Sequence, residues 1–256
     1  MLRVFKKYLW YLIAGESIIL MFVAALVHDH SSWLFPILLG LGASIVLFII
    51  LELKATSMHL RILGILYTWQ KPQDFVQVYE PLSESKNLRK NLRFTMKVYV
   101  SNGYAAMGDF SNALKSLDQA PNITGKQAQK SKAIIHCNKC AIYLWSGETE
   151  KARQHYQALE KINMKSMESS TELLRLHLSL NEKQVTEEDA DCLRSMLKAT
   201  TSVFHKTELS YLLGDVYYLL GEREFAKSYF TDATQGGTQL LVSRLAQEKL
   251  SSLTTK

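Results

Sequence analysis

Residues 211–233, YLLGDVYYLLGEREFAKSYFTDA, contain a residue spacing that two earlier stretches of the chain share. In all three, a tyrosine is followed after four residues by a glycine, after nine by an alanine, and after thirteen and sixteen by small, apolar or aromatic residues. The three sets are Tyr104, Gly108, Ala113, Leu117 and Ala120; Tyr143, Gly147, Ala152, Tyr156 and Leu159; and Tyr217, Gly221, Ala226, Phe230 and Ala233. A spacing that recurs without change indicates a structural repeat.

The offsets within each set predict a helical hairpin. The tyrosine lies late in a first helix, and the glycine ends that helix in a left-handed conformation. The alanine is small because two helices cross closely there, and the last two positions fall on the buried face of the second helix.

The distances between the glycines predict how many hairpins there are. They are 39 and 74 residues, and the longer distance leaves room for one degenerate hairpin over 168–199, broken near Asn181 and without the glycine. We therefore expect four hairpins over about 94–235 and a capping helix over 238–253, because stacked repeats need a terminal unit with a polar outer face.

This pattern resembles the tetratricopeptide repeat family. Leu213 and Gly214 match the family's Leu-Gly pair in the first helix, although Ser210 stands where the family commonly has tryptophan. In the two earlier hairpins the pair is replaced by Val-Ser at 100–101 and by Lys-Cys at 139–140. The resemblance implies an α-solenoid in which the first helix of each hairpin lines a groove for an extended peptide or a partner helix.

Some members of the family hold a C-terminal carboxylate with lysines, an arginine and two asparagines. Asn102 and Asn138 occupy the two asparagine positions, but Val98, Glu208 and Leu212 stand where cations are expected. The resemblance therefore implies a partner-binding groove without the family's carboxylate clamp. The residues expected to contact the partner are Tyr99, Asn102 and Asn138.

The composition favours an all-α fold. The four prolines lie at 36, 72, 81 and 121, and the β-branched and aromatic residues do not form short alternating runs. Three cysteines do not build a disulfide framework and suit a reducing compartment. The net charge of +6 does not require a nucleic-acid partner, and none is expected.

Two apolar segments precede the repeats. Residues 8–27 carry one charge, Glu16, and residues 34–51 carry none. A bilayer core of ~30 Å needs about 20 helical residues, and helix is the only structure open to isolated spans in lipid. The expected domains are a transmembrane helical hairpin over 1–53 with spans at about 8–27 and 34–53, a juxtamembrane helical connector over 54–93, and a solenoid with its capping helix over 94–256.

The cations that flank these segments predict their orientation. Arg3, Lys6 and Lys7 precede the first segment, Lys54 and Arg61 follow the second, and the loop between them has no lysine or arginine. Under the positive-inside rule both termini lie in the cytoplasm. The absence of a targeting signal fits a bacterial plasma membrane.

Glu16 is an intramembrane polar residue in this interpretation. A carboxylate near the bilayer centre costs about 2.5–3.5 kcal/mol on insertion scales, so it should be protonated, paired or turned toward another helix. One interpretation is that Glu16 is a functional group, either part of a proton- or ion-linked site or a contact to another membrane subunit. The alternative is a polar contact within the hairpin or between two copies in a homo-oligomer, because the small residues at 40–44 let helices approach closely.

A basic stripe precedes the first repeat. Its spacing places most of the cations on one helical face. The stripe consists of Lys86, Arg89, Lys90, Arg93 and Lys97. Contact with anionic membrane lipid or with a partner is one interpretation, and an ordinary solvated face is the other.

Few motifs indicate chemistry. Cys137 and Cys140 form a CxxC beside His136, which suggests a metal or redox site as an alternative. The repeat alignment argues against it, because Cys140 takes the small-residue position that Gly214 has in the last hairpin, and a buried cysteine packs as a small hydrophobe. Phosphate-loop, dinucleotide-loop, zinc-protease and serine-hydrolase motifs are absent. We expect no enzymatic activity, no cofactor and no metal.

The sequence as a whole predicts a scaffold or adaptor that binds protein at the cytoplasmic face of a membrane. The first alternative is an accessory subunit of a membrane complex that acts through the transmembrane hairpin and Glu16. The second alternative is a metal or redox protein that uses Cys137 and Cys140.

Overall fold

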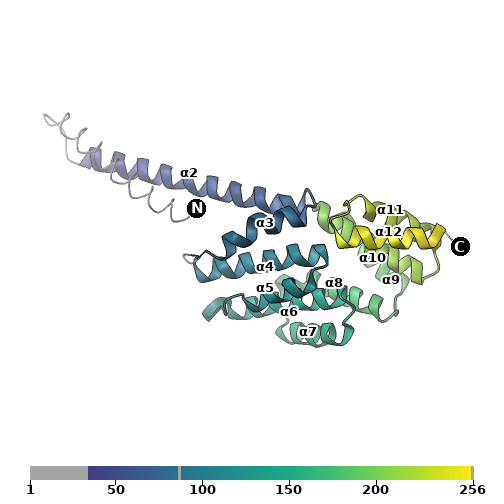
Figure 1. The fold of residues 1–256 in the computed structure, drawn as a ribbon. Helices are drawn as coiled ribbons and strands as arrows, with labels where there is room; N and C mark the ends of the chain where they lie inside the picture. Colours follow the sequence, from purple (N-terminus) through teal and green to yellow (C-terminus); the bar gives the residue numbers. More distant parts are fainter. Residues whose placement is uncertain (1–33, 86–87, 255–256) are drawn as a thin grey trace. The chain divides into compact units, whose positions relative to one another are not determined.

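The computed structural model describes residues 34–85 and 88–254, and every regular element in these two ranges is helical (Figure 1). The expected all-α class is therefore confirmed for this part of the chain. The α-helices are α2 Leu34–Tyr67, α3 Pro72–Ser83, α4 Lys90–Met107, α5 Phe110–Asp118, α6 Ala128–Trp145, α7 Thr149–Ile162, α8 Glu168–Asn181, α9 Glu187–Ala199, α10 Val203–Leu219, α11 Arg223–Thr234 and α12 Leu241–Thr254. The expected first span over 8–27, Glu16 and Lys86 lie outside the described residues.

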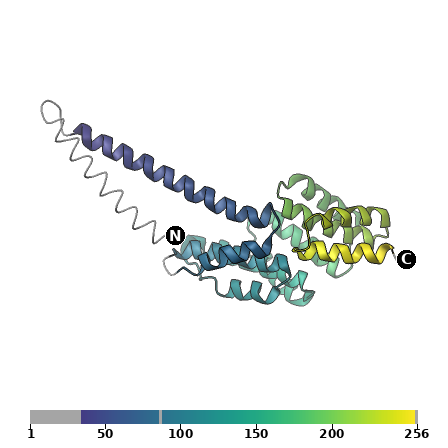
Figure 2. The same cartoon turned by 45° about the horizontal axis from the view of Figure 1, so that its top comes forward.

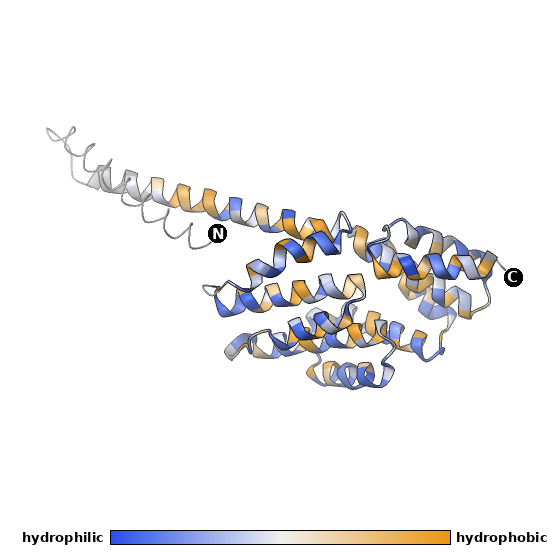
Figure 3. Ribbon diagram, in the orientation of Figure 1, coloured by the Kyte–Doolittle hydropathy of each residue, from blue (hydrophilic) through white to orange (hydrophobic). Residues whose placement is uncertain are grey.

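The chain divides into two compact units, and the division falls inside α2, between Arg61 and Ile62. The part of α2 that belongs to the first unit is strongly apolar from Ile45 to Leu51 and mixed in polarity from Glu52 to Arg61, as the change from orange to blue and white in Figure 3 shows. Seven of its large apolar side chains are more than half exposed: Ile45, Val46, Phe48, Ile49, Ile50, Leu53 and Leu60. By length and composition, one stretch of the described chain, Gly42–Tyr67, could cross a membrane. This stretch overlaps the expected second span at 34–53.

The second unit, Ile62–Lys256, is built from antiparallel helix pairs. Helix α4 packs against α5, α6 against α7, and α10 against α11. The first helices of successive pairs also touch, since α4 contacts α6, α6 contacts α8, and α8 contacts α10. The helices that the three tyrosine–glycine sets predict are therefore present, in pairs that follow one another through the unit.

Three of the turns between paired helices have the same geometry. Gly108, Gly147 and Gly221 have φ angles of 85°, 77° and 85°, the left-handed region that favours glycine. In each turn the amide after the glycine donates to the carbonyl of the tyrosine five residues earlier, over 2.9 Å. This bond and the one from the glycine amide form a Schellman motif, which satisfies carbonyls that a helix end would leave unpaired.

The small-residue positions are where the paired helices approach closely. Ala113, Ala152 and Ala226 are fully buried. In the last pair, a Cβ atom added to Gly214 would lie 2.5 Å from the Phe230 ring. Cys140, which takes the position of Gly214 in the second pair, is also fully buried. These contacts allow little side-chain volume because protein interiors are close-packed.

The two helices expected over 168–199 are present as α8 and α9, and α8 ends at the expected Asn181. Helix α9 touches α8 only slightly and packs mainly against α10. Lys183 takes the place of the missing glycine with a φ of 58°, and the amide of Gln184 donates to the carbonyl of Ser179 over 2.8 Å. The turn is the same Schellman type, built on a residue that is strained there. Two extra residues separate Lys183 from the buried Ala190, compared with the glycine-to-alanine spacing of the other pairs.

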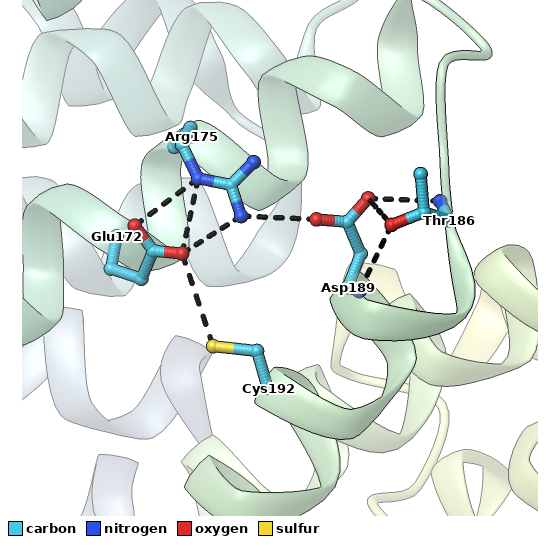
Figure 4. A network of polar contacts seen from close by, with 5 residues as sticks. All are labelled: Glu172, Arg175, Thr186, Asp189 and Cys192. Carbon is cyan, nitrogen blue, oxygen red and sulfur yellow. Dashed lines mark hydrogen bonds and ion pairs between the residues drawn. The ribbon is translucent and has the colours of Figure 1, made fainter.

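A polar network fixes this longer turn (Figure 4). Thr186 caps α9 in a capping box with Asp189: the Thr186 amide donates to the Asp189 carboxylate over 2.9 Å, and the Asp189 amide donates to the Thr186 hydroxyl over 3.3 Å. Arg175 on α8 bridges Asp189 at 3.0 Å and Glu172 at 2.8 Å. The network ties the start of α9 to α8 and substitutes for the geometry that a glycine turn gives the other hairpins.

Helix α3 belongs to the same unit as the hairpins. Phe75 and Tyr79 are fully buried and stack with their ring centroids 4.9 Å apart. A Cβ atom on Gly103 of α4 would lie 2.6 Å from the Val76 side chain, so α3 packs very closely against α4. The expected connector over 54–93 is therefore not a separate segment, because its second half forms a helix pair with α4.

The capping helix expected over 238–253 is α12, which lies alongside α11 and also touches α10 (Figure 2). Its Arg244 donates from Nη2 to the Met107 carbonyl at the end of α4, over 2.8 Å. The Gln70 side chain, between α2 and α3, donates to the Val203 carbonyl of α10 over 3.1 Å. The last hairpin and its cap therefore contact the first elements of the unit.

Replacing Lys183 by glycine should stabilise the fold, because it removes a left-handed backbone conformation that costs a residue with a side chain about 1–2 kcal/mol. Glycine also makes the unfolded chain more flexible, which offsets part of this effect. We therefore expect the free energy of unfolding to rise by about 0.5–1 kcal/mol. The measurement is thermal unfolding of the full chain in detergent, followed by circular dichroism.

The matched control is Gly221→Ala, since a Cβ atom there meets nothing within 4 Å and the change is a pure backbone effect. This variant should lose about 1 kcal/mol. A Lys183→Gly protein that is less stable than the wild type would contradict the assigned turn.

Candidate functional site

A cavity of about 180 Å³ lies within the second unit, lined mainly by the first helices of three hairpins. Helices α4, α6 and α10 supply most of its wall, with the end of α2 and the start of α12, whereas α5, α7 and α11 supply none of it. The lining residues are Tyr67, Asn102, Ala105, Ala106, Asn138, Ala141, Ile142, Trp145, Phe204, His205, Glu208, Leu241 and Val242.

Two of the three expected groove residues meet in this cavity. Asn102 comes from α4 and Asn138 from α6, 36 residues apart in the sequence, and both line it. Tyr99 does not line the cavity; its ring packs edge-on against Tyr67 and Tyr79, at centroid distances of 6.3 and 6.1 Å. Tyr99 therefore supports the wall of the site through Tyr67.

Both asparagine amides use their N–H groups on the scaffold. Asn138 Nδ2 donates to the Ile134 carbonyl one turn earlier, over 2.8 Å, and Asn102 Nδ2 donates to the Tyr67 hydroxyl over 3.1 Å. A carbonyl can only accept, so the first bond fixes which end of the Asn138 amide is nitrogen. Within the described part of the chain, neither amide oxygen accepts a hydrogen bond.

Glu208 is the carboxylate of the cavity. No described residue forms an ion pair or a hydrogen bond with it, and none of the residues that line the cavity is a lysine or an arginine. Burial without a partner raises the pKa of Glu208 to about 8, because a low-polarity environment disfavours the charged form. At neutral pH this carboxyl group is therefore largely protonated while the cavity is empty.

The remaining wall is largely aromatic. Phe204 and His205 precede Glu208 on α10, and their rings pack near Tyr67 at centroid distances of 5.6 and 5.7 Å. Burial lowers the pKa of His205, so its imidazole is neutral at pH 7. Trp145 completes the α6 wall and packs edge-on against the buried His177, with centroids 4.5 Å apart.

Sequence reasoning missed these aromatic wall residues, although a signal for them exists. Trp145 follows Asn138, an expected groove residue, by seven residues, and Phe204 precedes Glu208, which stands at a position of the family's clamp, by four. Each therefore lies on the same helical face as that residue. The other residues of the cavity wall could therefore have been predicted from their position on the same helical face.

The structure changes the composition of the basic stripe. Lys97 is buried, and its ammonium group binds Glu84 at 2.9 Å and the Gln119 amide oxygen at 3.0 Å. The hydrogen bond from Lys97 lowers the pKa of Glu84. Lys97 holds α4 in place and is not available to lipid or to a partner, which corrects its expected role. Arg89 and Lys90 are exposed, and Arg93 donates to the Ser85 carbonyl over 3.1 Å.

The surroundings of the two cysteines of the CxxC favour the protonated thiol. Cys140 is fully buried, and burial raises the pKa of Cys137 to about 11 and that of Cys140 to about 12. A thiol must lose its proton to ligate a metal or attack a disulfide, so this environment opposes both roles. His136 and His155 face one another with their Nδ1 atoms 2.9 Å apart, yet no group of three metal-binding side chains occurs among the described residues.

Comparison with known proteins does not assign the chain to a family. No protein-family model, no curated protein and no solved structure matches the chain. The class of protein must therefore be inferred from the helix pairs, the exposed apolar helix and the cavity.

Glu208→Gln should change how stability depends on pH. The folded-state pKa of Glu208 is higher than that of a glutamate in an unfolded chain, so folding favours the protonated form. The stability that this provides is complete below about pH 4 and is lost as the pH rises toward about 8. The thermal midpoint of the glutamine variant should therefore exceed that of the wild type by more at pH 9 than at pH 5.

Glu224→Gln, an exposed substitution on α11, serves as the control and should show the same difference from the wild type at both pH values. An identical pH profile for Glu208→Gln and the wild type would show that Glu208 is ordinarily solvated.

Proposed function

We propose that the protein is a membrane-anchored adaptor of the tetratricopeptide type, which binds a segment of another protein in the cavity between its first helices. The observation that carries this proposal is the composition of the cavity wall. Asn102, Asn138 and Glu208 come from three separate hairpins, and each lies on the first helix of its pair. In a repeat protein this is the face that binds partners, because stacking places equivalent helices side by side.

The Schellman turns support the resemblance to the family. All four turns are of the same left-handed type, and in the three that contain glycine a buried alanine follows at the same distance in the next helix. The fold alone favours protein binding over any particular pathway. The site adds a cavity with free acceptor groups and aromatic walls, a composition suited to holding a side chain.

The membrane anchor in this proposal consists of the segments at about 8–27 and 34–53. The exposed apolar side chains between Ile45 and Leu53 support the second segment, because a monomeric soluble protein rarely exposes so continuous an apolar surface. The lysines and arginines that flank the two segments support an orientation with both termini, and with them the helical unit, on the cytoplasmic side of the membrane.

The anchor is tested by membrane fractionation. The full chain should stay in the membrane pellet after high-salt and alkaline washing, because apolar spans leave lipid only in detergent. A chain that begins at Ile62 should move to the supernatant. Recovery of the full chain in the aqueous fraction without detergent would refute the anchor.

The adaptor role is tested by filling the cavity. Ala141 lines it, so Ala141→Trp should occupy the space and reduce recovery of cross-linked partners by about tenfold or more, since each 1.4 kcal/mol of lost affinity is a factor of ten. Recovery is measured by affinity capture of the full chain from detergent-solubilised membranes.

The matched control is Ala199→Trp, which adds the same side chain at an exposed site at the end of α9. A chain that ends at Arg61 gives the background that the membrane segments capture on their own. Equal recovery of partners by the full chain and by this truncated chain would refute the adaptor proposal.

A further inference from the structure

The polar groups of the cavity are predominantly hydrogen-bond acceptors. Asn102 and Asn138 donate to Tyr67 and to the Ile134 carbonyl, and their amide oxygens accept nothing from the described residues. Glu208 adds a carboxylate with no bonded partner in the same part of the chain. An amide oxygen and an ionised carboxylate are acceptors only, so a ligand that satisfies all three must bring several hydrogen-bond donors.

The charge of the cavity has one sign. Every titratable group that faces it is known: Tyr67 from the end of α2, and His205 and Glu208 from α10. The walls from α4, α6 and α12 contribute asparagine, alanine, isoleucine, tryptophan, leucine and valine. With the tyrosine and the histidine neutral, ionised Glu208 is the only charge of the wall. A buried charge without a counter-ion is costly, and a ligand cation would remove that cost.

The aromatic walls also favour a cation. Tyr67, Trp145 and Phe204 line the same space, and an ammonium or guanidinium group is attracted to the face of an aromatic ring. The volume of 180 Å³ is well below the roughly 300–1,000 Å³ of sites that take drug-sized ligands. The space suits one long side chain and excludes a helix or a large cofactor.

We propose that the cavity receives a lysine or arginine side chain of the partner polypeptide, with Glu208 as its counter-charge and the Asn102 and Asn138 oxygens accepting from its N–H groups. This inference rests on the proposed adaptor function and specifies the chemistry of the partner. It reverses the charge preference of a carboxylate clamp. The partner's basic side chain enters an acceptor-lined space, whereas a C-terminal carboxylate would meet the two amide oxygens and the Glu208 carboxyl group.

Binding of a cation should be linked to release of a proton. Glu208 must ionise to pair with the ligand, and the empty cavity holds its pKa at about 8. Affinity for a cation should therefore rise between about pH 6 and about pH 9. Protonation of His205 at the acid end repels the same ligand and acts in the same direction.

The test uses blocked amino acids as probes, so that only the side chain differs. Nα-acetyl-L-arginine N-methylamide is compared with the corresponding citrulline derivative, which has nearly the same shape without the charge. A third probe is an acetylated dipeptide with a free C-terminal carboxylate. Trp145 lines the cavity and serves as the fluorescent reporter in the full chain in non-ionic detergent, with Trp10, Trp33 and Trp69 replaced by phenylalanine.

The arginine probe should produce a saturable change, and citrulline should bind at least about tenfold more weakly, the factor expected for one charge-assisted hydrogen bond. Glu208→Gln should weaken arginine by a similar factor and abolish the rise in affinity with pH, while Glu224→Gln leaves both unchanged. Circular dichroism checks that Glu208→Gln, a nearly isosteric change, is folded.

Three results would overturn the inference. They are equal affinity for arginine and citrulline, tighter binding of the free-carboxylate dipeptide than of arginine, and no saturable change with arginine up to its solubility limit. The proposed adaptor function is refuted by a separate result, namely that capture of partners does not depend on residues 62–256. A different result would separate the two proposals. If the wild type and Glu208→Gln capture partners equally while Ala141→Trp does not, the adaptor proposal stands and the proposal of a bound basic side chain is refuted.

Discussion

The left-handed turn that joins the two helices of each pair is the constraint on which the second unit depends. Its defining bond runs from the amide after the left-handed residue to the carbonyl five residues earlier, as from Asp109 to Tyr104. The bond satisfies a carbonyl at the end of the first helix and sets the direction in which the second helix leaves. Buried small side chains then let the two helices pack at short range, as at Gly214 against Phe230.

These turns indirectly build the cavity. In three pairs the second helix folds back against its own first helix, as α5 does against α4, α7 against α6 and α11 against α10. The first helices of successive pairs also contact one another. Their common face brings Asn102, Asn138 and Glu208 into one space although more than a hundred residues separate the first from the last. Leu241 and Val242 at the start of α12 line the same space, and Arg244 joins α12 to the end of α4.

The sequence predicted the features that depend on local spacing. The three glycine turns and the buried alanines follow from offsets within about twenty residues, as does the placement of Asn102 and Asn138 on first helices. The helices over 168–199 follow from the 74-residue distance between Gly147 and Gly221. Features set by tertiary contacts could not be predicted. Lys97 belongs to a regular basic stripe, and only the packing of α3 and α5 against α4 shows that its ammonium group is buried between Glu84 and Gln119.

The degenerate hairpin marks the limit of reasoning from spacing. A lysine holds the left-handed position at 183, and two extra residues shift Ala190 out of register, so the offsets of the other hairpins do not apply. The bonds among Arg175, Thr186 and Asp189 that compensate for this come from two helices and have no signature in a repeat pattern.

Residue-resolved amide hydrogen exchange on the full chain in detergent tests the shared turn most directly. The account predicts that the amides of Asp109, Glu148, Gln184 and Glu222 are all protected, because each donates the bond that closes a turn. Gln184 is the decisive amide, since its turn has no glycine. Exchange of Gln184 at the rate of an unstructured peptide, beside protected amides in the other three turns, would contradict the four-hairpin architecture.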